Sequence, residues 1–413
     1  MMNMFKIPLL AIAVALSSLS LSGCEVVNSL RMMQINSDAK PVITDKGRIK
    51  LKSVFLGEKP YIYAKINDEE LLFLLDTGAS FFILNDTPKV KKLGLKQGFE
   101  LYLAGWGEQE DTQAYKTDVN RIDLGGVHFD DMKAAVIPVS KTHYYLQEDE
   151  AIKDGVIGHD IMKHFTWEID AANNEIYISQ AKYQPEENAQ HFELNEFFNK
   201  ISIKGDLAFN NKHVADGEFI IDTGSRHYVK LSTAYPKDNN INIASPRIRA
   251  ADFGLSGKVE HDRVILPSLT LGDIKLNNVK VNLIPSDDED DWWILGNALM
   301  NQFKTVIDYA NEAFYLVPQQ PFVTDHNLFG LELRKIRSGE FVVRYIFPDL
   351  PASKLAIKVG DLVTQINNKN AAEISLSEYN DIASQTAEHQ ICIKRENQCF
   401  TIEAKHIAGY SNR

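Results

Sequence analysis

The sequence lacks any run rich in lysine or arginine. Acidic residues outnumber basic ones by 56 to 44, which gives a formal net charge of -12. Since no segment has the basic character needed to follow a phosphate backbone, we expect no nucleic acid among the partners. The content of 44% hydrophobic and 24% charged residues is ordinary for globular proteins, and a length of 413 residues suggests about two or three domains.

The sequence also lacks several familiar catalytic and metal-binding patterns. His143, His159 and His164 do not have a metal-ligand spacing, and no Ser/His/Asp arrangement has a nucleophile-elbow context. The acidic run Asp287–Asp291 lacks the glycine and the distant glutamate of an EF-hand loop, so it is predicted to be a solvated loop. We therefore predict no metal and no cofactor.

No apolar run reaches the roughly 20 residues that cross a bilayer, but a shorter one follows Lys6. This run, Ile7–Leu19, leads to a Leu-Ser-Gly-Cys sequence ending at Cys24, which resembles the lipobox of bacterial lipoproteins. The resemblance implies a signal peptide at 1–23, lipid attached to Cys24 and a linker at 24–49. An ordinary secretory signal or an uncleaved anchor is the alternative. Either way we expect export, and the lipobox places the chain in the bacterial cell envelope, facing the periplasm, with inner or outer membrane undecided.

Two further cysteines, Cys392 and Cys399, flank a predicted hairpin tip. In an oxidising compartment they form a disulfide only if the register places them opposite each other. A disulfide and two free thiols both remain open.

A long internal repeat is the main feature of the sequence. Asp76-Thr77-Gly78 recurs as Asp222-Thr223-Gly224, and further segments recur in the same order at a nearly constant shift. These pairs are Ala104–Gly107 with Ala251–Gly254, Leu124-Gly125 with Leu271-Gly272, Val136–Pro138 with Leu283–Pro285, and Val156–Gly158 with Ile294–Gly296. Short strand-like runs surround them, so two mostly β lobes are expected at 50–188 and 189–320.

The two Asp-Thr-Gly motifs, each after an apolar strand and each followed later by an apolar-apolar-Gly, carry a family resemblance. The chain resembles the aspartic peptidases of the retropepsin and pepsin type. This implies a mostly β, bilobal aspartic-protease fold in which Asp76 and Asp222 face each other across a peptide-binding cleft. When two carboxylates lie so near each other, they cannot both ionise. The pair therefore shares one proton and activates a water.

The residues around the aspartates have predicted supporting roles. Gly78 and Gly224 allow the close backbone approach and the tight turn. The resemblance implies that Thr77 and Thr223 bond across the lobes through their hydroxyls. Ser225 is placed to bond the second carboxylate, whereas the alanine in the matching position of the first lobe cannot.

A lid over the cleft is expected from the Gly-rich turn at Trp106, and from Phe253 in the second lobe, each with an aromatic side chain to cover substrate. The alternative is an ordinary hairpin with an exposed aromatic side chain.

Beyond the repeat, residues 325–408 resemble a PDZ domain. The resemblance implies that the loop at Gly330 binds the carboxylate of an extended C-terminal peptide, with Leu331 and Leu333 lining the pocket for its last side chain. A docked packing domain with a blocked groove is the alternative.

These observations favour an aspartic endopeptidase acting on exported proteins or peptides. The alternative is a catalytically silent peptide-binding or assembly lipoprotein that uses the same lobes and third domain. A further alternative is that the lobes pair between two chains rather than within one.

Overall fold

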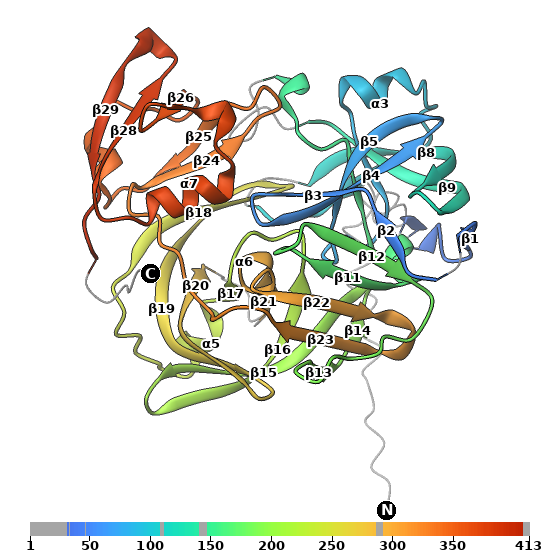
Figure 1. Cartoon of the computed structure of the whole chain (residues 1–413), viewed down its shortest axis with the longest axis horizontal. Coiled ribbons are helices and arrows are strands. Elements are labelled where there is room, and N and C mark those ends of the chain that lie inside the picture. The colour runs from blue at the N-terminus through green and yellow to red at the C-terminus, as the bar shows by residue number, and fades with distance from the viewer. Residues whose placement is uncertain are drawn as a thin grey trace, which may run out of the picture.

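The computed structural model describes residues 31–407 apart from 33, 46, 108–110, 140–146 and 286–291. It is mostly β, with two β-rich lobes that each carry one half of the repeat. A third domain, orange to red in Figure 1, lies against both lobes.

Lobe 1 is a nine-stranded sheet in which the strand before Asp76 is central. Its strand order is β1-β9-β6-β10-β5-β4-β8-β7, with β3 paired to β4. The bounds are β1 (Val42–Ile43), β3 (Ser53–Leu56), β4 (Lys59–Ile66), β5 (Glu69–Leu75), β6 (Ile83–Asn85), β7 (Glu100–Leu103), β8 (Thr112–Asp123), β9 (Val127–Ile137) and β10 (Gly155–Ile157), with helix α3 (Pro88–Lys92) beside them. The turn between β4 and β5 is the Asn67-Asp68 pair, whose positive φ angles of 50° and 65° suit these residue types.

Lobe 2 repeats this arrangement in an eight-stranded sheet of order β14-β15-β16-β21-β17-β20-β19-β18. The bounds are β14 (Asn195–Phe197), β15 (Lys200–Asn210), β16 (His213–Asp222), β17 (Val229–Ser232), β18 (Ile248–Gly254), β19 (Gly257–Leu271), β20 (Ile274–Ile284) and β21 (Trp293–Gly296), with helix α5 (Ala234–Asp238). Short helices follow the apolar-apolar-Gly segments in both lobes: α4 (His159–Met162) and α6 (Asn297–Met300).

A third sheet joins the lobes and belongs to both. Its six strands, in order β13-β23-β22-β11-β12-β2, come from both halves of the repeat and lie between them in Figure 1. The bounds are β2 (Ile49–Leu51), β11 (Thr166–Asp170), β12 (Glu175–Ser179), β13 (Gln190–Glu193), β22 (Phe303–Asp308) and β23 (Ala313–Pro318). Because β11 pairs with β22 across the repeat, the halves share this sheet in addition to their own lobes.

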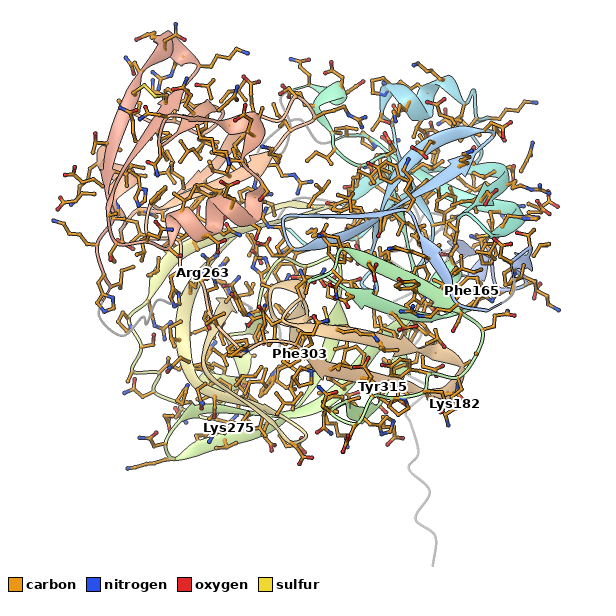
Figure 2. All side chains as sticks on the ribbon, in the orientation of Figure 1. Phe165, Lys182, Arg263, Lys275, Phe303 and Tyr315 are labelled. Atoms are coloured by element: carbon orange, nitrogen blue, oxygen red, sulfur yellow. A yellow bond between two sulfur atoms is a disulfide. The ribbon has the colours of Figure 1, made fainter. Side chains whose placement is uncertain are left out.

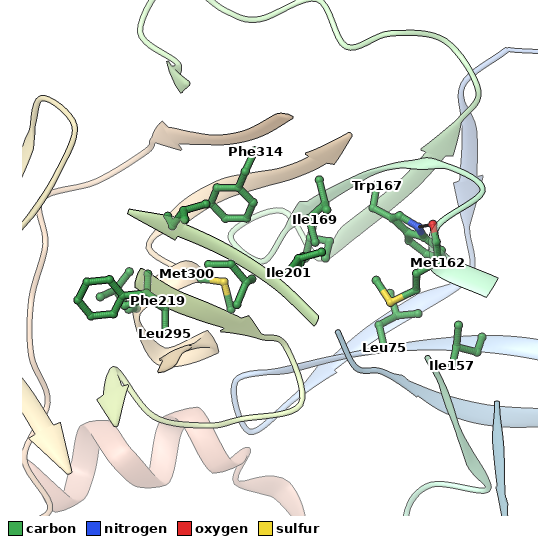
Figure 3. Packing of buried hydrophobic residues seen from close by; sticks show 14 of the residues in the cluster. Leu75, Ile157, Met162, Trp167, Ile169, Ile201, Phe219, Leu295, Met300 and Phe314 are labelled. Atoms are coloured by element: carbon green, nitrogen blue, oxygen red, sulfur yellow. Dashed lines mark hydrogen bonds between the residues drawn. The ribbon is translucent and has the colours of Figure 1, made fainter. Parts of the chain in front are cut away.

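One hydrophobic core runs through both lobes and the shared sheet. Figure 3 shows Leu75 and Ile157 of lobe 1 on one side of it, and Phe219 and Leu295 of lobe 2 on the other. All four are at most 1% exposed. Continuous burial of this kind makes the lobes one packing unit, so the two halves pair within one chain.

The third domain is a six-stranded sheet with one helix of eight residues. Its bounds are β24 (Leu331–Lys335), β25 (Phe341–Ile346), β26 (Leu362–Ile366), β27 (Lys369–Asn370), α7 (Leu376–Ala383), β28 (Glu388–Ile393) and β29 (Cys399–Glu403). Cys392 and Cys399 lie opposite each other on β28 and β29 and form a disulfide, which resolves the alternatives left open by the sequence.

Side chains of all three units meet where the third domain docks. On lobe 2, strand β18 packs against Tyr345, Phe347 and Leu350 of the third domain. The guanidinium of Arg263, labelled in Figure 2, lies 5.3 Å from the Phe347 ring centroid. Toward lobe 1, Arg337 of the third domain donates to the carbonyl of Ala151 at 2.8 Å. The third domain therefore bridges the lobes rather than hanging from one of them.

Candidate active site

Each Asp-Thr-Gly segment begins where an apolar strand ends. In lobe 1, β5 is paired in parallel with β10, and the amide of Asp76 donates to the carbonyl of Ile157 at 3.1 Å. In lobe 2, β16 is paired in parallel with β21, which places Asp222 opposite Gly296. The distant apolar-apolar-Gly strands therefore hold both aspartates at the ends of buried strands, where the backbone has little freedom.

Thr77 and Thr223 cross between the lobes and are each 1% exposed. The amide of each threonine donates to the hydroxyl of the other at 3.0 Å. The Thr77 hydroxyl donates to the carbonyl of Ile221 at 2.5 Å, and the Thr223 hydroxyl donates to that of Leu75 at 2.9 Å. Four buried hydrogen bonds thus fix the two Asp-Thr-Gly turns relative to each other.

The carboxylates of Asp76 and Asp222 meet at the glycines of these turns. A Cβ added to Gly78 would lie 2.9 Å from Oδ1 of each aspartate, so these oxygens are no farther apart than the sum of the two distances. A Cβ on Gly224 would lie 2.4 Å from both carboxylate oxygens of Asp76. Any larger residue at either position would displace a carboxylate, which explains the need for glycine.

Hydrogen bonds and burial make the pair electrostatically unusual. The amide of Gly78 donates to Asp76 at 2.8 Å, and the amide of Gly224 donates to Asp222 at 2.9 Å. Burial raises the pKa of Asp222, and the neighbouring charge of Asp76 raises it further. The pair therefore favours a state with one proton retained.

The predicted role of Ser225 does not match the geometry. Its hydroxyl makes no hydrogen bond to Asp222, and it has no partner within the described part of the chain. Only the Ser225 backbone takes part in the turn, with its amide donating to the Asp222 carbonyl at 3.1 Å and its carbonyl accepting from the Asn297 amide at 2.9 Å.

Sequence reasoning missed Asn297, which supports the second turn. This side chain is 1% exposed and its Nδ2 donates to the carbonyl of Thr223. Asn297 directly follows Ile294-Leu295-Gly296, at the position where the first lobe has His159. This difference between the two halves of the repeat was a signal that the sequence offered.

Three lysines near the aspartates were also missed. Lys200 donates to the carbonyl of Gly78, and Lys59, Lys200 and Lys230 all lower the pKa of Asp222 through their charges. Their signal was weak, because a lysine at the start of a strand ordinarily points to solvent.

The two Gly-containing turns, one from each lobe, contact each other. The amide of Ser256 donates to the carbonyl of Trp106 at 3.0 Å. A Cβ on Gly107 would lie 1.9 Å from the Ser256 carbonyl oxygen, so the two turns are in direct backbone contact. The half-buried Trp106 ring lies 4.0 Å from Nζ of Lys230, and its centroid is 5.1 Å from that of Trp292. We call residues 104–107 and 254–257 the flap tips.

Phe253 differs from the expectation that it covers substrate. Its ring packs with Tyr345 and Phe347 of the third domain, and Arg344 lies 4.4 Å from its centroid. Alternation along β18 is the reason, because the residue beside it, Asp252, points the other way toward His227 and Lys230.

A comparison with known families agrees with this geometry. Both lobes match the aspartyl protease family. The family model, described as aspartyl protease, matches residues 62–161 and 205–299. Each matched region contains one Asp-Thr-Gly segment and its apolar-apolar-Gly strand. No curated protein matches the chain.

The third domain lies outside the regions matched to the aspartyl protease family. Two backbone groups of its predicted peptide-binding loop make hydrogen bonds within the domain. The amide of Gly330 donates to Oδ1 of Asn327 at 3.0 Å. The carbonyl of Leu331 accepts from Nδ2 of Asn327 and from the Tyr379 hydroxyl, both at 2.7 Å. Leu331 and Leu333 are at most 1% exposed and belong to the domain core. The Gly330 amide therefore already has a partner within the domain, and peptide binding by this loop stays a prediction.

Some sequence predictions lie outside the described residues. These are the lipidation site Cys24, the histidine His143 and the acidic run Asp287–Asp291. Among the described residues, no group of three or more His, Cys, Asp or Glu side chains is arranged to hold a metal ion. None of the described helices has the length and apolar character needed to cross a membrane.

Proposed function

We propose that the chain is an aspartic endopeptidase whose catalytic residues are Asp76 and Asp222. The observation that carries this proposal is the approach of the two carboxylates at Gly78, with both turns tied together by Thr77 and Thr223. Two lobes that match the aspartyl protease family support it.

The chemistry follows from one proton shared by the pair. Asp222, whose pKa is raised by burial and by Asp76, retains the proton and donates it toward the carbonyl oxygen of the scissile bond. Asp76 accepts a proton from a water between the carboxylates, and that water attacks the carbonyl carbon. As the C–N bond breaks, Asp76 passes its proton to the departing amine, and a hydroxyl on the former carbonyl carbon returns a proton to Asp222, which leaves two peptide fragments.

The flap tips have a role in this reaction. Their backbone contact at Ser256 and Trp106 joins the two lobes, and we propose that the joined tips cover the dyad and exclude bulk water from the attack. Because the tips contact each other directly, they must part to admit a peptide.

We further propose that the enzyme works in the bacterial envelope, held to a membrane through lipid on Cys24 and facing the periplasm. The Leu-Ser-Gly-Cys sequence supports this location. Replacing Cys24 by serine should release the mature chain from membrane fractions. Retention of the Cys24→Ser variant after a carbonate wash would contradict the anchor.

The experiment that tests the function is cleavage of a proteome-derived peptide library by the full chain in detergent. New peptide termini, identified by mass spectrometry, should accumulate with the wild type and not with Asp76→Asn. Equal termini from both proteins would leave the dyad without a role. An absence of new termini from wild type would favour a catalytically silent binding protein.

A further inference from the structure

The duplication places a lysine at the same point of each lobe. Lys59 is the first residue of β4 and Lys200 is the first residue of β15. Each follows the tight turn of the hairpin, β3–β4 or β14–β15, that precedes the strand leading to the aspartate. The pseudo-symmetry of the lobes therefore puts one lysine on each side of the dyad.

Lys200 lies next to the dyad, and Lys59 occupies the equivalent position of lobe 1. Nζ of Lys200 donates to the Gly78 carbonyl, beside both carboxylates, and Lys59 interacts with the charge of Asp76. Both side chains are half-buried. Burial lowers the pKa of both lysines, which reflects the cost of keeping an ammonium group away from water.

Positive charge accumulates further on the Lys59 side. Lys153 of lobe 1 and Arg334 of the third domain both interact with the charge of Lys59. The nearby carboxylate of Glu332 is already paired, because it forms ion pairs with Arg226 at 2.7 Å and with Arg344 at 2.8 Å. A chain with a net charge of -12 thus has a cationic surround at its candidate catalytic centre.

A cavity adjoins the β3–β4 hairpin that precedes Lys59, and its lining includes neighbours of Lys59 but not Lys59 itself. This cavity of about 700 Å³ lies between the β3–β4 hairpin, lobe 2 and the third domain, with Glu58, Arg226 and Arg334 in its lining. Within the described residues, Lys59 has no hydrogen bond or ion pair to a carboxylate. A peptide carboxylate would supply that partner and offset the cost of burying the ammonium.

We propose that the site cleaves peptides that carry aspartate or glutamate on either side of the scissile bond, with Lys59 and Lys200 each binding one of these carboxylates. The inference rests on the proposed peptidase function. It makes Lys59 and Lys200 specificity residues, and it makes Arg334 a contribution of the third domain to the Lys59 side. The alternative is that the lysines only hold the Asp-Thr-Gly turns in place.

The test uses the full chain and the same peptide library, with the residues beside each cut as the readout. Wild type should enrich aspartate and glutamate there by roughly tenfold over their abundance, since a hydrogen bond between charged groups favours the matching substrate strongly. Lys59→Met should lose the enrichment on one side of the cut, and Lys200→Met should lose it on the other. Lys65→Met and Lys204→Met, at exposed positions of the same strands, serve as matched controls that keep it.

Conservative variants separate specificity from a structural role. Lys59→Arg and Lys200→Arg keep the charge and should keep the enrichment. If methionine variants lower the rate on all peptides equally and leave the acidic preference unchanged, the lysines are structural and the inference is wrong. Cuts by wild type without acidic enrichment also overturn it, while leaving the peptidase function intact. No cuts by wild type overturn both.

Discussion

At the residue scale, the two threonines do more than the aspartates to hold the site together. The Thr77 hydroxyl both accepts from the Thr223 amide and donates to the Ile221 carbonyl, in a place with 1% exposure. If this hydroxyl is removed, neither of these backbone groups can form a hydrogen bond to water instead. The cost of an unsatisfied buried group then decides the effect of a substitution.

We predict that Thr77→Val lowers the free energy of unfolding by roughly 2–4 kcal/mol, because two buried backbone groups lose their partner. Urea unfolding followed by circular dichroism measures this change. Thr305→Val is the matched control, since its hydroxyl makes one long bond, 3.3 Å, to the Met300 carbonyl. A loss no larger than that of the control would contradict the role of Thr77 in joining the lobes.

A second prediction concerns the buried carboxyl of Asp160. Burial raises its pKa to about 6, although Asn36 donates to it at 2.6 Å and the Phe82 amide at 3.0 Å. Because the folded pKa exceeds the unfolded one of about 4, the stabilising contribution is complete below about pH 4 and is lost as the pH rises toward 6. Asp160→Asn keeps both acceptor contacts without the charge.

The Asp160→Asn variant should therefore gain stability relative to wild type as the pH rises, by roughly 2–3 kcal/mol at pH 7 and by little at pH 4. Unfolding by urea across this range measures the difference. Asp216→Asn, at an exposed position on β16, should show no such trend. A constant difference between Asp160→Asn and wild type would mean that the carboxyl is not buried as described.

At the element scale, the β3–β4 hairpin connects the dyad to the third domain. Asn380 of α7 donates to the Glu58 carboxylate at 2.5 Å, and Nδ2 of Asn301 donates to the Glu58 carbonyl at 2.6 Å. Gly57, at the tip, has a φ of 57°, and a Cβ there would lie 2.4 Å from Cδ2 of Leu376. The hairpin tip is therefore seated directly against α7.

We predict that Gly57→Ala loosens the third domain from lobe 1, because the added carbon meets Leu376 and strains the left-handed backbone. Hydrogen exchange should then increase in α7 and in β3. Removing the contact by Leu376→Ala in the same chain should restore part of the protection, since the backbone strain remains but the clash does not. Unchanged exchange in the single variant would show that the contact does not hold the domain.

The same scale shows what the sequence could predict. Strands β25 and β26 and helix α7 are the kind of element that a sequence can predict, because each is set by local periodicity and by nearby turn residues. The shared sheet was not foreseen. Its pairs, such as Thr166 with Asp308, depend on registers between distant segments that no local pattern specifies.

For the candidate site, the repeat identified Asp76 and Asp222, and the structure brings these carboxylates together. The expected contacts of Ser225 with Asp222 and of Phe253 with substrate were wrong. Side-chain directions in a turn and along a strand depend on the final backbone, which the sequence does not show. Leu331 and Leu333 were assigned to a pocket but are buried in the domain core. Lys59 and Lys200 are visible only once the two hairpins are superimposed through the repeat.

At the scale of the whole molecule, two halves of one chain share a core, a sheet and a candidate catalytic centre, and a third domain bridges them. Arg337 reaches from the third domain to Asp154, whose side chain is 0% exposed and also accepts from the Thr87 hydroxyl and the Leu72 amide. Lobe 1 is thus tied to the third domain through a carboxylate that also holds its own loops. We expect the dyad to respond to changes in any of the three units.

The central claim is that Asp76 and Asp222 act as one catalytic unit. Its most direct test is the rate of cleavage of one library-derived peptide by wild type, Asp76→Asn, Asp222→Asn and the double variant, with folding checked by circular dichroism. Each single variant should lower kcat by roughly a thousandfold or more, and the double variant should lower it no further, because either loss removes the shared proton chemistry. A single variant with near wild-type kcat, or losses that multiply in the double variant, would contradict the claim.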